Sequence, residues 1–248
     1  MKKNNPKILV TGGTSRFCKY LKKEFSKFKV IFPSKKQFDI TNYSNMKKFI
    51  KGKKINIIIH IAALSRPMKI HDNFPEKSID VNIIGTSNIV KIAILKKIKL
   101  IFFSSQYVYP GTKGNYKETD PLLPFNNYAW SKLGAESAVQ MYKNSLILRI
   151  CMTEFPFVHK QAIRGAKTSF LFNKDVAKIL PYLLNEKGIL NIGGKKRDIY
   201  KFAKKYKKDI ASIDFRKLKN FAKDTSIDNS KLVSLLKKKR FNFKKVIF

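Results

Sequence analysis

Tyr128 and Lys132 are the residues whose types and spacing best fit acid/base chemistry. They lie four positions apart in Tyr128-Ala129-Trp130-Ser131-Lys132, and on a helix such positions share one face. An ammonium group beside a phenol lowers the pKa of the phenol and makes it a better proton donor. Ser105, at the end of a strand-like run, could hold the substrate oxygen. The chain has 46 Lys and 10 Tyr, so the pair will occur by chance, and taken alone it favours an ordinary amphipathic helix with a solvated Lys and a half-buried Tyr.

The N-terminal segment has the pattern of a dinucleotide-binding turn. Residues 7–11 form a short apolar run that favours a strand, a Gly-rich stretch follows at Gly12-Gly13-Thr14-Ser15-Arg16, and an amphipathic stretch covers 17–28. Glycines let the backbone approach a pyrophosphate, and a helix N-terminus offers it unpaired N–H groups. We expect Ser15 to cap that helix.

Strand-like and helix-like segments alternate along the chain. We expect strands at 7–11, 29–32, 55–60, 99–104, 145–150 and 189–192, and helices at 16–27, 43–52, 77–97, 126–143, 174–185 and 197–208. Short strands separated by helices predict an α/β fold with a Rossmann-type, doubly wound parallel sheet. Ligands in such folds bind outside the carboxyl ends of the strands, where Thr11, Ala62, Ser105 and Arg149 are expected.

Several further segments follow one another in an order that is typical of one family. They are Thr11-Gly12, Phe38-Asp39-Ile40-Thr41, His60-Ile61-Ala62-Ala63, Asn82-Ile83-Ile84-Gly85-Thr86-Ser87-Asn88, Phe103-Ser104-Ser105-Gln106-Tyr107-Val108-Tyr109 and Asn127-Tyr128-Ala129-Trp130-Ser131-Lys132-Leu133-Gly134-Ala135-Glu136. Through them the chain resembles the extended short-chain dehydrogenase/reductases that act on nucleotide sugars, and most of all the proteins similar to dTDP-4-dehydrorhamnose reductase. The resemblance runs from about Lys7 to Leu236.

The sequence departs from the family pattern in two places. Ser15 and Cys18 stand where the family has its second and third glycines, and the stretch from Arg149 to Asn173 is shorter than in the reductases. The resemblance covers the N-terminal part of the chain better, and it implies an NAD(P)-binding Rossmann domain at 1–150. A reduced substrate-binding lobe at 151–248 is expected to interleave with the last sheet elements, as a small C-terminal part of one compact unit.

The resemblance also implies the site residues. The catalytic roles fall to Ser105, Tyr128 and Lys132: Tyr128 gives a proton to the developing alkoxide, Ser105 hydrogen-bonds the same oxygen, and Lys132 holds the nicotinamide ribose and keeps Tyr128 acidic. Ser104 should point to the other face of its strand. The residues expected to bind the cofactor, besides Tyr128 and Lys132, are Thr11, Gly12, Thr14, Ser15, Arg16, Phe17, Ser34, Lys35, Asp39, Ile40, Ala62, Ala63 and Leu64.

The segment after the second strand bears on the choice of cofactor. An acidic residue there would bind a ribose 2′-hydroxyl and select NAD. Phe32 is followed instead by Pro33-Ser34-Lys35-Lys36, and Arg16 adds a guanidinium. Cations favour a 2′-phosphate, so we expect NADP(H), with NAD(H) as the alternative.

The composition limits the partners. The net charge is +37, but only 7 of the 53 basic residues are Arg, the residue that specific nucleic-acid sites favour. We expect no specific nucleic acid, no membrane and a cytoplasmic protein with reduced Cys18 and Cys151. A metal site is not expected, because the three histidines share no ligand spacing with the cysteines, and His60 is expected to be structural.

The expected function is reduction of the 4-keto group of a nucleotide sugar by NADPH. Epimerisation by the same three residues and a non-catalytic NADP-binding subunit are the alternatives. Dehydration is disfavoured, because dehydratases of the family carry Thr-Asp-Glu where this chain has Ser105-Gln106-Tyr107. A homodimer is left as a possibility.

Overall fold

A six-stranded sheet is the centre of the computed structural model, which describes residues 6–218 and 221–242. The strand order is β10-β5-β4-β3-β1-β2, and the sheet is parallel. Its strands are β1 (Lys7–Thr11), β2 (Lys29–Ile31), β3 (Ile57–His60), β4 (Lys99–Ser105), β5 (Ser145–Ile150) and β10 (Gly188–Ile192). The predicted α/β class and parallel Rossmann-type sheet are confirmed.

The middle strands are buried on both faces. All four residues of β3 and all six of β5 are buried, as expected for a parallel sheet covered by helices. Register is parallel between β1 and β3, where Thr11 pairs with His60, and between β3 and β4, where His60 pairs with Phe102. The carboxyl ends of these strands therefore lie level with one another.

The chain divides into two compact units, each assembled from separate stretches. The first unit contains the chain up to Ser104, Ser131–Leu148 and Leu183–Gly188, and the second contains Ser105–Trp130, Arg149–Tyr182 and the chain from Ile189 onward. The predicted boundary at residue 150 stays a prediction.

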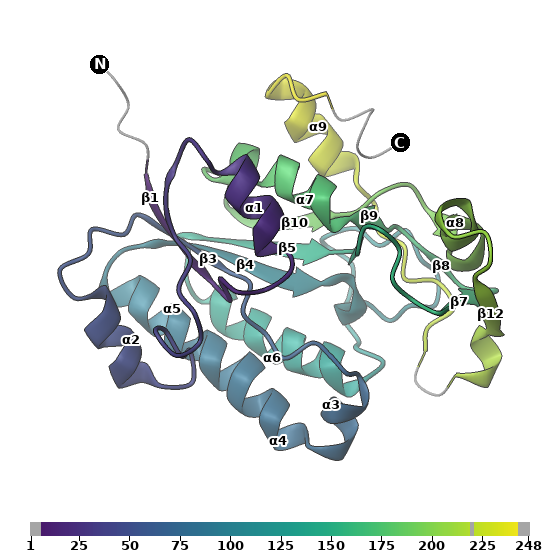
Figure 1. Ribbon diagram of the computed structural model, residues 1–248, viewed down its shortest axis with the longest axis horizontal. Helices are drawn as coiled ribbons and strands as arrows, with labels where there is room; N and C mark the ends of the chain where they lie inside the picture. The colour runs from purple at the N-terminus through teal and green to yellow at the C-terminus, as the bar shows by residue number, and fades with distance from the viewer. Residues whose placement is uncertain (1–5, 219–220, 243–248) are drawn as a thin grey trace. The chain divides into compact units, whose positions relative to one another are not determined.

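The helices of the first unit cover its strands. They are α1 (Cys18–Glu24), α2 (Tyr43–Ile50), α3 (Lys69–Asn73), α4 (Pro75–Ser78), the π-helix η1 (Ile79–Ile84), α5 (Gly85–Leu95) and most of α6 (Asn127–Gln140). The helices α5 and α6 lie on one face of the sheet and α1 lies on the other (Figure 1). Asn42 caps α2 by accepting a hydrogen bond from the Asn45 N–H, and Asn126, just before α6, accepts one from the Ala129 N–H.

The stretch Pro75–Leu95 is the one described helix that is long and apolar enough to cross a membrane, and half of it is buried inside the fold. A core helix of a globular protein has the same composition, so the finding carries no argument for a membrane.

The second unit is built from short elements. They are the 3₁₀-helices η2 (Gln106–Val108), η3 (Leu180–Leu183, divided between the units) and η4 (Phe215–Lys217), the strands β6 (Met152–Thr153), β7 (Gln161–Arg164), β8 (Lys167–Thr168), β9 (Leu171–Phe172), β11 (Arg197–Asp198) and β12 (Ala211–Asp214), and the helices α7 (Asn173–Ile179), α8 (Ile199–Tyr206) and α9 (Ser230–Lys238). The short strands pair as β11–β8, β12–β7 and β6–β9.

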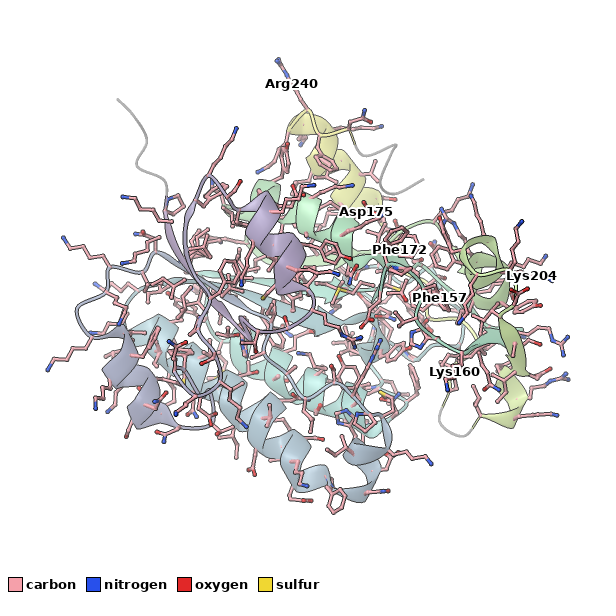
Figure 2. The ribbon with its side chains drawn as sticks, in the orientation of Figure 1. Phe157, Lys160, Phe172, Asp175, Lys204 and Arg240 are labelled. Carbon is pink, nitrogen blue, oxygen red and sulfur yellow. The ribbon has the colours of Figure 1, made fainter. Side chains whose placement is uncertain are left out.

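An aromatic cluster forms part of the core of the second unit. The Phe202 ring lies 5.5 Å from the Phe172 ring and 6.4 Å from the Phe157 ring. Phe157 and Phe172 lie inside the unit and Lys204 of α8 lies at its surface (Figure 2). This packing stabilises a part of the chain that has little regular secondary structure.

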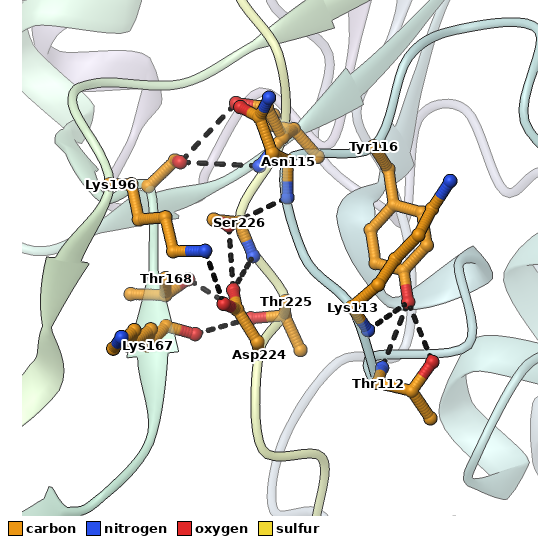
Figure 3. A network of polar contacts seen from close by, with 12 residues as sticks. Thr112, Lys113, Asn115, Tyr116, Lys167, Thr168, Lys196, Asp224, Thr225 and Ser226 are labelled. Carbon is orange, nitrogen blue, oxygen red and sulfur yellow. Dashed lines mark hydrogen bonds and ion pairs between the residues drawn. The ribbon is translucent and has the colours of Figure 1, made fainter.

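A polar network fixes the loop after β4 to the segment before α9 (Figure 3). The Asp224 carboxylate accepts hydrogen bonds from the Ser226 hydroxyl (2.6 Å) and N–H (3.0 Å), and pairs with Lys196 at 2.6 Å. A Cβ atom at Gly114 would lie 2.1 Å from Asp224, and Gly114 has a φ of +69°. Only glycine fits this crossing without displacing the acid.

Candidate functional site

The turn between β1 and α1 lies against the ends of two neighbouring strands. Gly12 has a φ of +70°, and a Cβ atom there would lie 3.1 Å from the Ala62 backbone after β3. A Cβ atom at Gly13 would lie 2.5 Å from the backbone of Phe32, after β2. Both glycines are thus needed for packing, whether or not a ligand binds. Thr14, Ser15 and Arg16 follow and are exposed, so this turn is open to a ligand.

The predicted Ser15 cap of α1 is wrong. The helix begins at Cys18, and its N-cap position is held by Phe17, without a side-chain cap. The Ser15 hydroxyl donates instead to the Cys18 Sγ atom (3.4 Å), and the Cys18 thiol donates to the Gly12 carbonyl (3.4 Å). Phe17, expected to bind the cofactor, has its side chain buried against Phe103, with ring centroids 5.6 Å apart. Any contact it makes to a ligand would come from its backbone.

His60 has a structural role, as predicted. Thr11 Oγ1 accepts hydrogen bonds from the Ile61 and Ala62 N–H groups (3.2 and 3.1 Å), so its own proton is directed to His60 Nδ1, 2.8 Å away. Nε2 then carries the ring proton and donates to Thr86 Oγ1 at 2.9 Å. Burial, and then the nearby Lys132, lower the pKa of His60 to about 3. The ring is therefore a neutral link between β1, β3 and α5.

The residues after β2 are partly engaged with one another. The Ser34 N–H donates to Gln37 Oε1 (2.9 Å), and the Gln37 N–H donates to Ser34 Oγ (3.3 Å). Lys35 and Lys36 are exposed. The Lys22 ammonium of α1 lies 5.6 Å from the centre of the Phe32 ring and acts on the pKa of Cys18. Lys22 thus lies near both the Gly-rich turn and the end of β2. It was not among the residues expected to bind the cofactor.

Asp39 and Ile40 have local partners. The Asp39 carboxylate accepts from the Thr41 N–H (3.0 Å) and hydroxyl (2.8 Å). The Ile40 carbonyl accepts from Asn88 at 3.0 Å, and a Cβ atom at Gly85 would lie 2.9 Å from the Ile40 side chain. These contacts fix the loop against α5, and a role of the two residues in cofactor binding stays a prediction.

Asn82 connects the segment after β3 to α6. Its Oδ1 accepts from the Leu64 N–H (2.8 Å), and its Nδ2 donates to the Leu64 carbonyl (2.9 Å) and to the Ser131 hydroxyl (2.8 Å). Asn82 lies in the π-helix η1, a rare geometry that is frequent at functional sites. These bonds hold the segment after β3 close to Ser131, the residue before Lys132. The segment contains the partly exposed Ala62, Ala63 and Leu64.

Lys132 is buried against β4. Only 3% of it is exposed, its ammonium lies 4.2 Å from the centre of the Phe102 ring, and burial lowers its pKa to about 7 against the opposing effect of Glu136. Ser104 Oγ donates to Glu136 Oε2 at 2.7 Å. Ser104 therefore faces α6, and the assignment of Ser105 as the substrate-binding serine stays a prediction.

Ser105 and Tyr128 lie in the same unit and share Tyr107 as a neighbour. Ser105 Oγ accepts from the Tyr107 N–H at 3.2 Å and donates to Gln106 Oε1 at 3.3 Å. The Tyr107 ring meets the Tyr128 ring edge-on, with centroids 6.4 Å apart, and packs on Phe125. Tyr107 was not among the expected site residues. Its aromatic side chain, two positions after Ser105, was the signal in the sequence that could have indicated it. Lys132 follows Tyr128 by one turn of α6.

A metal site has no support in the described part of the chain, which contains no group of three His, Cys, Asp or Glu residues able to hold an ion.

The parallel sheet, the Gly-rich turn after β1 and the Tyr-x-x-x-Lys pair on α6 define a Rossmann-type protein of the short-chain dehydrogenase/reductase class. The chain belongs to the RmlD substrate binding domain family, whose sequence model matches residues 6–153. The resemblance seen in the sequence is therefore confirmed.

Individual relatives differ in their named activities. Methionine adenosyltransferase 2 subunit beta from Pongo abelii is 27% identical over 179 residues, which cover 68% of this chain and 53% of that protein. The dTDP-4-dehydrorhamnose reductase from Aggregatibacter actinomycetemcomitans is 28% identical over 152 residues, 59% of this chain and 51% of that protein. The chain thus spans about half the length of the relatives that it matches.

A solved structure is similar over nearly the whole fold. The dTDP-4-dehydrorhamnose reductase from Bacillus anthracis str. Ames, in complex with NADP, has a TM-score of 0.84 and 19% identity, and the match covers 96% of this chain and 94% of that one. At this identity the likeness establishes the fold.

Proposed function

We propose that the protein is an NADP(H)-dependent oxidoreductase that reduces the 4-keto group of a nucleotide-activated sugar. The observation that carries the proposal is the placement of Ser105 and Tyr128 around Tyr107, with Lys132 one turn after Tyr128. A relative named dTDP-4-dehydrorhamnose reductase and a similar fold solved with NADP support it.

The exposed Thr14, Ser15 and Arg16 fit a dinucleotide, because they follow a Gly-rich turn at the start of a helix. When bound, the nicotinamide would supply the hydride. Tyr128 would donate its phenolic proton to the oxygen of the former ketone as negative charge develops there, and Ser105 Oγ would donate a hydrogen bond to that oxygen. Lys132 would bind the ribose and favour ionisation of Tyr128.

The test is turnover on a panel of nucleotide 4-keto sugars, with NADPH consumption followed and the products identified by mass spectrometry. Stoichiometric NADPH loss with a product two hydrogens heavier is the expected result. A product of unchanged mass with no net NADPH consumption would indicate the epimerase alternative.

A non-catalytic NADP-binding subunit is the second candidate. It is favoured by the relatives that are named as subunits of methionine adenosyltransferase and by the short stretch between Arg149 and Asn173. Dinucleotide binding without turnover on any sugar of the panel would support it. The homodimer stays a prediction that light scattering of the purified protein would test.

A further inference from the structure

Two ionisable side chains of α6 enter the interior of the first unit one turn apart. Lys132 is 3% exposed and Glu136 is fully buried. Acids and lysines are almost never buried to this degree unless they are paired, so the two residues need each other or another partner.

The strand β4 supplies the surroundings of this pair. The centre of the Phe102 ring lies 4.2 Å from the Lys132 ammonium. The Ser104 hydroxyl donates to Glu136 Oε2 at 2.7 Å. His60 on β3 is a further ionisable group that acts with Lys132. Burial lowers its pKa to about 3 and so keeps the ring neutral, while Thr11 and Thr86 form hydrogen bonds with its two nitrogens.

The balance of charge follows from these contacts. Burial disfavours the ammonium form of Lys132 and lowers its pKa to about 7, and Glu136 opposes that shift. A neutral His60 adds no charge of its own. A hydrogen bond from Ser104 fixes the position of the Glu136 carboxyl group.

We propose that Glu136, held by Ser104, is a positioning residue that keeps Lys132 charged inside the first unit. The use of this charge to bind a dinucleotide and to act on Tyr128 rests on the proposed function. The effect of Glu136 on the charge of Lys132 does not depend on that function, so the two statements can fail separately.

The direct test is an NMR titration of the protein labelled with ¹³C and ¹⁵N in lysine. The Lys132 signal is identified by its absence in Lys132→Arg. In Glu136→Gln we expect its midpoint to fall by about one pH unit or more, a tenfold change in the ionisation constant. Glu76→Gln, which removes an exposed acid of the same unit, is the matched control and should leave the midpoint unchanged. An unchanged midpoint in Glu136→Gln would overturn the proposal.

Ser104→Ala keeps the carboxyl group and removes only its hydrogen-bond donor, so it should shift the midpoint in the same direction by less. If Glu136→Gln does not fold, Ser104→Ala decides alone: a lowered midpoint supports the proposal and an unchanged one overturns it.

Dinucleotide affinity gives the functional readout. Glu136→Gln should weaken NADPH binding about tenfold or more at about pH 8 and less at about pH 6, because the ammonium form returns as pH falls. A uniform loss at both pH values would point to a purely structural role and contradict the proposal. If the wild-type protein binds no dinucleotide, the proposed function fails while the titration still decides the role of Glu136.

Discussion

Ser15 Oγ donates a hydrogen bond to Cys18 Sγ over 3.4 Å, and the Cys18 thiol donates to the Gly12 carbonyl over the same distance. Ser15 and Cys18 are the two residues that replace glycines of the family pattern. Through these two hydrogen bonds they connect the first turn of α1 to the Gly-rich turn. Ser15 is exposed, and its hydroxyl is directed along the turn to Cys18.

Cys18→Ala should lower the free energy of unfolding by about 1 kcal/mol, because it removes a buried sulfur atom of roughly the size of a methylene group. Ser15→Ala, at the exposed end of the same contact, should change it by about 0.5 kcal/mol or less. Urea unfolding followed by circular dichroism measures both. Equal losses in the two variants would contradict the view that the buried thiol is the stabilising partner.

NADPH should bind more tightly than NADH. Arg16 and Lys35 are exposed cations at the Gly-rich turn and after β2, and charge-assisted hydrogen bonds to a 2′-phosphate are worth about 1–3 kcal/mol, roughly tenfold or more in affinity. The double variant Arg16→Ala, Lys35→Ala should lose that difference while NADH affinity stays the same. Fluorescence of Trp130, which lies two residues after Tyr128, reports binding. Equal affinities for the two dinucleotides in the wild-type protein would refute the preference.

Lys22 should contribute to the same preference. Its ammonium group lies over the Phe32 ring, whereas Lys19 on the same helix lies over Tyr20 and serves as the matched control. We expect Lys22→Ala to weaken NADPH binding about two- to fivefold, in the range of an exposed charge contact, and Lys19→Ala to leave it unchanged. Equal effects of the two substitutions would show only a loss of general positive charge.

The sequence was sufficient for the sheet but not for the short strands of the second unit. The strands β1, β3, β4 and β5 are runs of apolar, mostly β-branched or aromatic residues buried on both faces, and such runs are visible locally. The strands β6, β8, β9 and β11 have two residues each. Their pairing depends on contacts between distant segments, so no local pattern could reveal them, and α9 lay in a Lys-rich tail without a clear boundary.

Within the site, local hydrogen bonds were the hardest to foresee. Ser15 had the residue type of a cap, but the chain makes a further turn before α1 begins at Cys18. Ser34 and Gln37 form a reciprocal pair that resembles a capping box, and the Ser-x-x-Gln spacing could have predicted it. The surroundings of Lys132, by contrast, follow from the fold. Phe102 and Ser104 lie two residues apart on β4 and so share one face, where Phe102 meets Lys132 and Ser104 meets Glu136, one helical turn after Lys132.

Stability should fall on the acid side because of His60. Its pKa is lowered from 6.5 to about 3 in the folded protein, so between these values the unfolded chain binds a proton that the folded protein does not. Stability therefore falls as pH decreases through this window, by on the order of 5 kcal/mol for complete protonation. His60→Gln should flatten this slope, although it lowers stability at neutral pH. Exposed His159 is the control: His159→Gln should keep the wild-type slope in urea unfolding at a series of pH values.

Tyr128→Phe should abolish turnover and leave dinucleotide affinity nearly intact. In the proposed mechanism the phenol would supply a proton as charge develops on the sugar oxygen, so its loss would act on the transition state, and general acid catalysis is worth roughly a hundred- to ten-thousand-fold in rate. Phe keeps the ring that packs edge-on against Tyr107, so the fold around Ser105 should persist. Lys132→Ala should damage both turnover and binding, and Ser105→Ala should lower the rate with little change in binding.

Steady-state turnover on the active keto sugar, measured beside the dissociation constant for NADPH, separates these effects. Tyr43→Phe removes the same hydroxyl from α2, outside the proposed site, and should keep the wild-type rate. If Tyr128→Phe retains more than about a tenth of the rate, the loss is too small for an essential proton donor. The proposed mechanism would then be wrong even with the fold intact, because a residue that only fills volume is replaced by Phe without loss. Binding retained with no turnover in the wild-type protein itself would instead favour the non-catalytic subunit.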